Sequence, residues 1–139
     1  MDRWTDNLFF LSLEQPENML MGSDGRLRLT DFSTAMQRGA PCADKFVGSA
    51  QYLSPEVLEG REPTEKVDYF GVGCVAYYLW QGRDLFLRDT DYLTWKAVLE
   101  EVPTLDDVPE VPGDAWMRRL VLQSTRRDPA ERQLELPAE

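Results

Sequence analysis

Two side chains, Asn18 and Asp31, are candidate ligands for a divalent metal ion. Asn18 closes the stretch "SLEQPEN", and Asp31 opens the stretch "DFS" a little further along the chain. Amide and carboxylate oxygens are ligands that Mg²⁺ accepts, and protein-bound Mg²⁺ commonly serves phosphate groups. The pair therefore indicates a site that handles phosphate. The alternative is that both side chains cap or hydrogen-bond the local backbone.

The composition narrows the chemistry that such a site can use. The chain has 139 residues, a formal net charge of −10 and no histidine. Without histidine, acid–base chemistry has to come from carboxylates, Lys, Tyr or Cys. A strongly acidic chain is also poorly suited to nucleic acid or to an anionic membrane surface, where Lys and Arg supply the affinity. We therefore expect no nucleic-acid partner.

The cysteines and the apolar runs indicate the compartment. Cys42 and Cys74 are too few and too far apart for a disulfide framework or a metal site. We expect Cys74 to be a core residue, and Cys42 to be either a plain loop thiol or a redox-sensitive one. The N-terminus does not fit a signal peptide, and the uncharged run at 70–82 is too short to span a bilayer. These features predict a soluble cytoplasmic protein without membrane insertion.

The first half of the chain predicts a β-hairpin over about residues 19–31. Apolar and polar residues alternate on both sides of "GSDG", which has the composition of a tight turn. Residues 34–50 show no steady period and predict a loop. A short helix is then expected, with Ser54 as N-cap, Pro55 at its first position and Gly60 at its end.

The second half is predicted to be helical. The longest helix, at about 65–81, is apolar nearly all round and should be buried on all sides. Shorter helices are expected at 92–101 and 115–123, with an extended acidic connection across 97–117 and an N-cap at Asp128. The predicted fold class is therefore mainly α, in one domain, with a small hairpin ahead of a central buried helix.

Five short motifs occur in an order that is typical of one family. They are "PEN" at 16–18, "DF" at 31–32, "VGSAQYLSPE" at 47–56, "DYFGVG" at 68–73 and the Arg of "DPAER" at 132. Taken together they resemble the C-terminal lobe of a eukaryotic-type serine/threonine protein kinase. The stretches "FVGSAQYLSPEVL" and "DTDYLTWKAVLE" are most similar to the 3-phosphoinositide-dependent protein kinase of the AGC group.

The resemblance divides the chain into three parts. Residues 9–133 are expected to form the kinase-like lobe, with 1–8 as an N-terminal remnant and 134–139 as a tail. The sequence contains no glycine-rich phosphate loop and no Val-Ala-x-Lys strand. We therefore expect the N-terminal lobe to be absent and the ATP site, which the family forms between two lobes, to be incomplete.

The catalytic positions that the resemblance implies are altered. The family uses ATP and Mg²⁺ and transfers the γ-phosphate to a protein Ser or Thr. Its pattern His-Arg-Asp-Leu-Lys-Pro-Glu-Asn places the catalytic Asp at Leu13 and the catalytic-loop Lys at Gln15. Neither replacement can perform the original role, so no catalytic residue is intact. The neighbouring Glu14 is either a substitute base or, alternatively, a solvated carboxylate.

The positions that bind metal and regulate the family are partly kept. Asn18 and Asp31 match its Mg²⁺ ligands, but Ser33 replaces the Gly that follows Asp-Phe. The activation-loop phosphosite is Lys45, and the Arg that would pair with its phosphate is Ser12. Binding of ATP and Mg²⁺ by this chain alone is therefore in question.

The structural positions of the family are kept best. Glu56 and Arg132 match a buried ion pair that ties the end of the activation segment to the late helices. Asp68 matches an Asp at a helix start that hydrogen-bonds the catalytic-loop backbone. Ser49 stands in place of a Thr.

These positions predict a protein-kinase-like fragment with impaired catalysis. One alternative is a pseudokinase interaction module that binds a partner kinase or a substrate protein. Another is a degenerate or incomplete gene fragment without independent function. The acidic stretch 97–117 is either a surface for a basic partner or a solvated connection.

Overall fold

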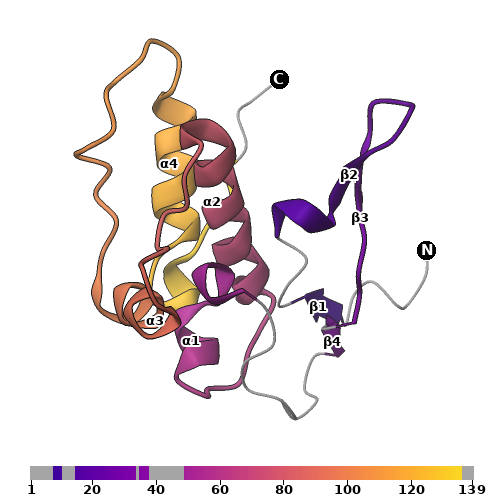
Figure 1. Ribbon diagram of the computed structural model, residues 1–139, viewed down its shortest axis with the longest axis vertical. Helices are drawn as coiled ribbons and strands as arrows, with labels where there is room; N and C mark the ends of the chain where they lie inside the picture. The colour runs from indigo at the N-terminus through magenta and orange to yellow at the C-terminus, as the bar shows by residue number, and fades with distance from the viewer. Residues whose placement is uncertain (1–7, 11–14, 34, 38–48, 136–139) are drawn as a thin grey trace.

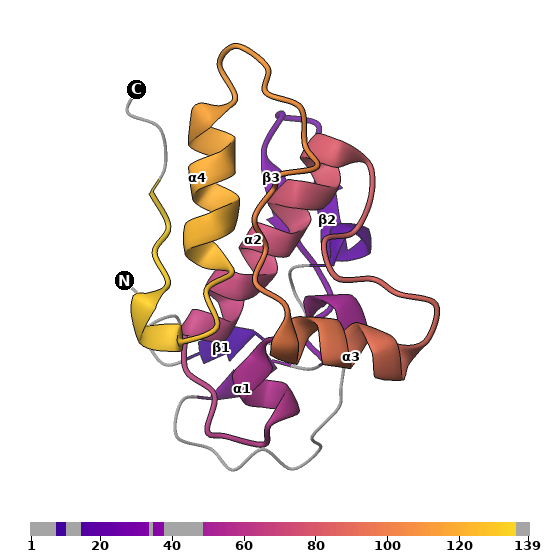
Figure 2. The same ribbon diagram turned by 90° about the vertical axis from the view of Figure 1, so that its left-hand side faces the viewer.

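The computed structural model describes residues 8–10, 15–33, 35–37 and 49–135 (Figure 1). Two helices, α2 and α4, lie side by side, and α1 and α3 lie near one end of α2 (Figures 1 and 2). The hairpin β2–β3 extends away from the helices. The mainly α class with a small hairpin is therefore confirmed.

The hairpin pairs β2 (Met19–Met21) with β3 (Leu27–Leu29), in antiparallel register with Leu20 opposite Arg28. The turn uses Gly25 at φ 76°, a left-handed conformation that glycine adopts without steric cost. Across the turn the Asp24 carboxylate accepts hydrogen bonds from the Arg26 N–H at 3.1 Å and from the Arg28 guanidinium at 2.9 Å. The predicted hairpin is confirmed.

A second antiparallel pair joins β1 (Leu8–Phe10) to β4 (Ala35–Gln37), with Phe9 opposite Met36. The predicted loop at 34–50 was therefore wrong for residues 35–37. A strand of three residues is too short to show a two-residue period, and its partner lies far away in the sequence. Only the tertiary pairing defines this strand.

Helix α1 (Pro55–Leu58) begins and ends where the sequence predicted. Pro55 occupies the first position, and Gly60 follows the helix at φ 71°. Ser54 lies at the N-cap position, but its side chain makes no capping hydrogen bond. Its hydroxyl is buried without a hydrogen-bond partner among the described residues, so the expected capping role was wrong.

Helix α2 (Lys66–Gln81) is the predicted central helix. It ends at Gly82, whose φ of 70° closes the helix through a 2.8 Å hydrogen bond from its N–H to the Tyr78 carbonyl. Phe70 is fully buried, as the apolar pattern predicted. Tyr78 and Leu79, however, are 37% and 70% exposed, so the helix is not buried on all sides.

Helix α4 (Ala115–Ser124) crosses α2 at a close contact around Gly73. A Cβ atom at position 73 would lie 2.1 Å from the Ser124 hydroxyl oxygen. That hydroxyl donates a 2.7 Å hydrogen bond to the Leu120 carbonyl, which satisfies a polar group inside the contact. A glycine on α2 is therefore required for this helix spacing.

Helix α3 (Asp91–Glu100) starts at Thr90, whose hydroxyl accepts a 3.2 Å hydrogen bond from the Leu93 N–H. The connection from α3 to α4 contains no helix or strand, as predicted. It is not merely solvated, because Leu105 and Val108 are each 5% exposed and belong to a core cluster with Val121. The sequence did not predict this contribution to the core, because acidic residues surround these two apolar side chains in the chain.

No helix in the part of the chain that the structure describes combines the length and the apolar character needed to cross a membrane.

Candidate functional site

The structure brings Asn18 and Asp31 to the same end of the hairpin. The Asn18 carbonyl accepts a 2.9 Å hydrogen bond from the Thr30 N–H, next to Asp31 in the chain. Asn18 is half-buried at the end of a 3-10 turn (Pro16–Asn18), whereas Asp31 is exposed. The two oxygen-bearing residues therefore share a location but differ in their surroundings.

Asp31 has a left-handed backbone conformation, and its carboxylate is hydrogen-bonded by Ser33, two residues further along the chain. Its φ of 64° is left-handed, which is uncommon for a residue other than glycine. One carboxylate oxygen accepts a 2.6 Å hydrogen bond from the Ser33 hydroxyl and a 3.2 Å bond from the Ser33 N–H. These two bonds lower the pKa of Asp31 below its ordinary value. Ser33, the residue in place of the family's glycine, thus holds the candidate metal ligand.

The described residues do not form a metal cage. Among them, no group of three or more His, Cys, Asp or Glu side chains is arranged to hold an ion. Asn18 and Asp31 supply three side-chain oxygens at most, and one oxygen of Asp31 already bonds Ser33. Mg²⁺ in proteins commonly completes its octahedral coordination with water and substrate phosphates, so these two residues supply only part of a coordination sphere.

We predict that Ser33→Gly raises the pKa of Asp31 toward its ordinary value. The hydroxyl of Ser33 makes the largest contribution to the lowered pKa, and the glycine variant keeps only the N–H bond. Because the native pKa is depressed, the stabilisation from these bonds is complete at neutral pH and is lost as the pH falls through that pKa. An NMR titration of the carboxyl carbons measures the shift.

Asp24 supplies the control for this titration. Its pKa is also lowered, but by hydrogen bonds from Arg26 and Arg28, which the variant leaves in place. The Asp24 titration should therefore not move. An unchanged Asp31 titration in Ser33→Gly would contradict the role assigned to the Ser33 hydroxyl.

Only some of the candidate positions lie among the residues that the structure describes. Gln15 is half-buried at the start of the 3-10 turn, where its carbonyl accepts a 2.9 Å hydrogen bond from the Asn18 N–H. Ser49 is half-buried, and its carbonyl accepts a 3.1 Å bond from the Tyr52 N–H. The remaining residues of interest lie outside the described residues; they are Ser12, Leu13, Glu14, Cys42 and Lys45.

The structure joins Glu56 and Arg132 in a buried ion pair. The guanidinium of Arg132 donates to both carboxylate oxygens of Glu56, at 2.5 and 2.7 Å. Arg132 is 0% and Glu56 is 2% exposed. Charges buried this deeply require complete hydrogen bonding, because their desolvation is costly.

Arg132 meets this requirement through backbone carbonyls that the sequence did not predict. Beyond Glu56, it donates to the carbonyls of Arg126 at 2.6 Å, Lys66 at 2.9 Å and Arg127 at 3.1 Å. The five N–H donors of a guanidinium therefore all have acceptors. The pair connects α1, the start of α2 and the segment after α4.

Two further polar residues of interest are Asp68 and Tyr52. Asp68 is half-buried in the first turn of α2, and the residues 11–14 that its family counterpart would bond lie outside the described part. The hydroxyl of Tyr52 donates a 2.9 Å hydrogen bond to the Asp84 carboxylate. Burial and this carboxylate raise the pKa of Tyr52. No sequence motif marked the Tyr52–Asp84 contact.

A hairpin, a buried Glu–Arg pair and a central helix crossed by later helices are the features of a protein kinase C-terminal lobe. Residues 15–133 match the protein kinase domain family, and the chain belongs to it. The chain is 38% identical over 94 residues to the serine/threonine-protein kinase PDK1 of Cryptococcus neoformans. It is 33% identical over 122 residues to human 3-phosphoinositide-dependent protein kinase 1, and 33% identical over 123 residues to the serine/threonine-protein kinase drp72 of Corynebacterium efficiens.

These alignments cover most of this chain but little of the relatives. They include 62%, 81% and 85% of the chain, respectively, and 8%, 21% and 23% of the three relatives. The predicted resemblance to the phosphoinositide-dependent kinases is confirmed. The chain thus corresponds to a kinase-domain fragment that spans at most about a quarter of these proteins.

Proposed function

We propose that this chain is a protein kinase C-terminal lobe that does not transfer phosphate and acts as a protein-binding module. The observation that carries the proposal is the pair Leu13 and Gln15 at the positions of the catalytic Asp and Lys. Protein kinases use the Asp to accept the proton of the substrate hydroxyl. A leucine side chain has no atom that can accept it.

The expected loss in the rate of phosphate transfer is large, and this supports a binding role. A positioned general base contributes about 10²–10⁴-fold to a rate, and charge neutralisation at the phosphate contributes separately. Gln15 has no charge to offer the transferred phosphate. ATP and Mg²⁺ serve the family in general, but the carboxylate of Asp31 is bonded to Ser33 here.

The buried structural residues also support the proposed binding function. Glu56 and Arg132 remain paired, and all donors of the guanidinium are satisfied. A binding module requires a folded lobe, and this buried ion pair with complete hydrogen bonding supports the fold without any catalytic residue. The proposed partner is a protein, either a kinase or a kinase substrate, and the proposed compartment is the cytoplasm.

Transfer of labelled phosphate tests the proposal. The whole chain is incubated with Mg²⁺ and labelled ATP, with a mixture of Ser and Thr acceptor peptides, beside an active kinase of the same family. We expect no incorporation above that of the Asp31→Ala variant. Incorporation by the unmodified chain that falls in Asp31→Ala would overturn the proposal, because Asp31 would then be a working metal ligand.

Thermal unfolding separates this proposal from that of a degenerate gene fragment. We expect one cooperative transition, because a fully bonded ion pair and a packed core must be lost together. A broad, non-cooperative transition would favour the degenerate fragment. Mg²⁺ with ADP should leave the midpoint unchanged, in the unmodified chain and in Asp31→Ala alike.

A further inference from the structure

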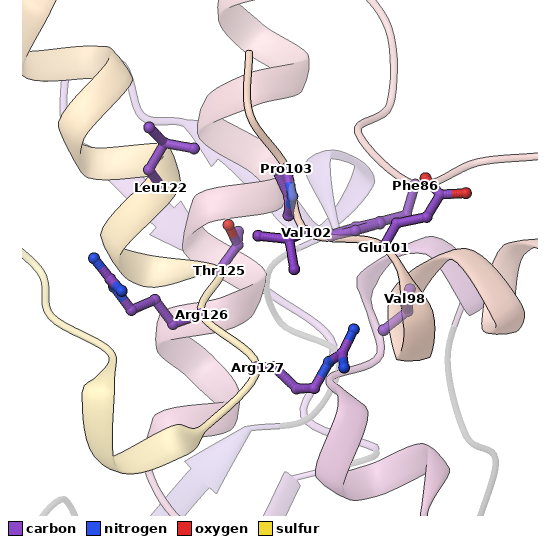
Figure 3. A pocket seen from close by; sticks show the side chains of 9 residues that line it. All are labelled: Phe86, Val98, Glu101, Val102, Pro103, Leu122, Thr125, Arg126 and Arg127. Carbon is purple, nitrogen blue, oxygen red and sulfur yellow. The ribbon is translucent and has the colours of Figure 1, made fainter. Parts of the chain in front are cut away.

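The hollow between the end of α3 and the end of α4 contains charges of both signs. It has a volume of about 210 Å³, and its lining includes Glu101, Arg126 and Arg127 beside apolar side chains (Figure 3). The carboxylate of Glu101 is already paired with Arg88 at 2.5 Å. This mixture of charges selects no particular occupant, in contrast to the outer edge of the hairpin.

The hairpin presents β3 as an open strand edge. The Thr30 N–H donates a 2.9 Å hydrogen bond to the Asn18 carbonyl across the hairpin. Hydrogen-bonded pairs alternate with non-hydrogen-bonded pairs in an antiparallel ladder, so the N–H and C=O groups of Leu27 and Leu29 point outward. In the part of the chain that the structure describes, β3 pairs with β2 alone. Such an edge is a template for a further strand.

The side chains along this edge are apolar and exposed. Leu27 is 58% and Leu29 is 45% exposed, and Met21, on the same face of the hairpin, is 70% exposed. In Figure 1 the hairpin extends away from α2 and α4. A sheet of two strands is marginally stable in water, and further strands that share an apolar face stabilise it. The structure therefore favours the addition of a strand at β3.

The two ends of β3 carry opposite charges. Arg26 is exposed just before β3 and forms no ion pair with any residue that the structure describes. Asp31 is exposed just after β3, and Ser33 occupies one of its two carboxylate oxygens. Between them, Arg28 is neutralised by the Asp24 carboxylate through hydrogen bonds of 2.9 and 3.1 Å. The edge thus has a positive end and a negative end.

We propose that two copies of this chain pair through the outer edges of β3, antiparallel and related by a two-fold axis. Pairing Leu27 of one copy with Leu29 of the other uses all the outward backbone groups of both residues. The same register brings Arg26 of each copy beside Asp31 of the other copy, because these residues lie at opposite ends of the strand. The edge is therefore complementary to itself in hydrogen bonding and in charge.

The charge of the hairpin also favours a second copy as the occupant. Two chains of net charge −10 repel each other over most of their surfaces. Residues 19–31 contain two Asp and two Arg, so the hairpin itself is neutral. Two copies approach through this surface without that repulsion. The proposed dimer is independent of the proposed binding of a kinase or a substrate protein.

Sedimentation velocity of the whole chain, from micromolar to millimolar concentration, measures the expected dimer. Arg26→Glu should weaken dimerisation by at least about tenfold, because it replaces two attractive pairs with two repulsive ones. Asp31→Arg should have the same effect, although it makes the chain less acidic and so lowers the general repulsion between copies. The matched control is Arg119→Glu on α4, where the native side chain is 63% exposed. It changes the net charge as Arg26→Glu does and should leave dimerisation within about twofold.

An equimolar mixture of the Arg26→Glu chain and the Asp31→Arg chain gives the sharpest test. In the mixed dimer each position 26 lies beside a position 31 of opposite charge. The mixture should therefore dimerise about as tightly as the unmodified chain, although neither variant does so alone. Damage to the fold by either substitution would not be repaired by mixing. Circular dichroism establishes that each variant is folded.

A chain that stays monomeric throughout the concentration range would overturn the inference. Equal effects of Arg26→Glu and Arg119→Glu would also overturn it, as would a mixture that associates no better than its two components. Assemblies that grow beyond the dimer would contradict a closed two-fold contact. The phosphate-transfer assay does not depend on dimerisation, so a failed dimer and a failed binding-module proposal can be told apart.

Discussion

Replacing Arg132 with methionine is expected to lower the free energy of unfolding by about 3–5 kcal/mol. The substitution leaves the Glu56 carboxylate buried at 2% exposure without its cation. It also removes the donors to the carbonyls of Lys66, Arg126 and Arg127. Because domains are stable by only about 5–15 kcal/mol, this is a large share of the total. Urea unfolding followed by tryptophan fluorescence measures the change.

A double-mutant cycle tests whether the ion pair itself causes this loss. Glu56→Met alone should also be strongly destabilising, because it strands the guanidinium. The double variant with methionine at both positions should be more stable than the sum of the two losses predicts, since no buried charge remains. Strictly additive losses would contradict the assignment of the effect to the pair. If Arg132→Met does not fold, Arg132→Lys, which keeps the charge but not the fork, supplies a smaller measurable loss.

Replacing Phe70 with alanine is expected to cost about 3–5 kcal/mol. The side chain is 0% exposed, and its ring stacks on Phe86 with centroids 5.5 Å apart. The guanidinium carbon of Arg132 lies 5.1 Å from the centre of the Phe70 ring. The substitution therefore opens a cavity beside the ion pair as well as beside α3.

The control for Phe70 is an aromatic residue on the surface. Tyr92 on α3 is 68% exposed, and Tyr92→Ala should change the free energy of unfolding by no more than about 0.5 kcal/mol. Phe70→Leu should fall between the two. A loss below about 1 kcal/mol for Phe70→Ala would show that the core around α2 is loosely packed.

Local features were predictable where local chemistry decides the conformation. The glycine turn at 22–25 and the apolar run of α2 each contain their own signal, and both elements lie where we expected them. Pairing between distant segments was not predictable from periodicity. The strand at 35–37 exists through its pairing with β1, and Leu105 reaches the core only through the path of the chain.

The same distinction between local and long-range information applies to the candidate site. The residue types at Leu13 and Gln15 can be read from the sequence, and they carry the proposal that phosphate transfer is lost. The state of Asp31 could not be read, because it depends on a left-handed backbone that turns the carboxylate onto Ser33.

The sequence by itself determined the family and the central helix, and it places Leu13 and Gln15 where the resemblance expects the catalytic Asp and Lys, because side-chain chemistry and short-range periodicity are properties of neighbouring residues. The tertiary structure alone decided which buried charges are satisfied and which apolar residues stay exposed. Those properties depend on distances between segments far apart in the chain. Arg132 shows both: its motif marked the position, and only the fold supplied the carbonyls that complete its hydrogen bonds.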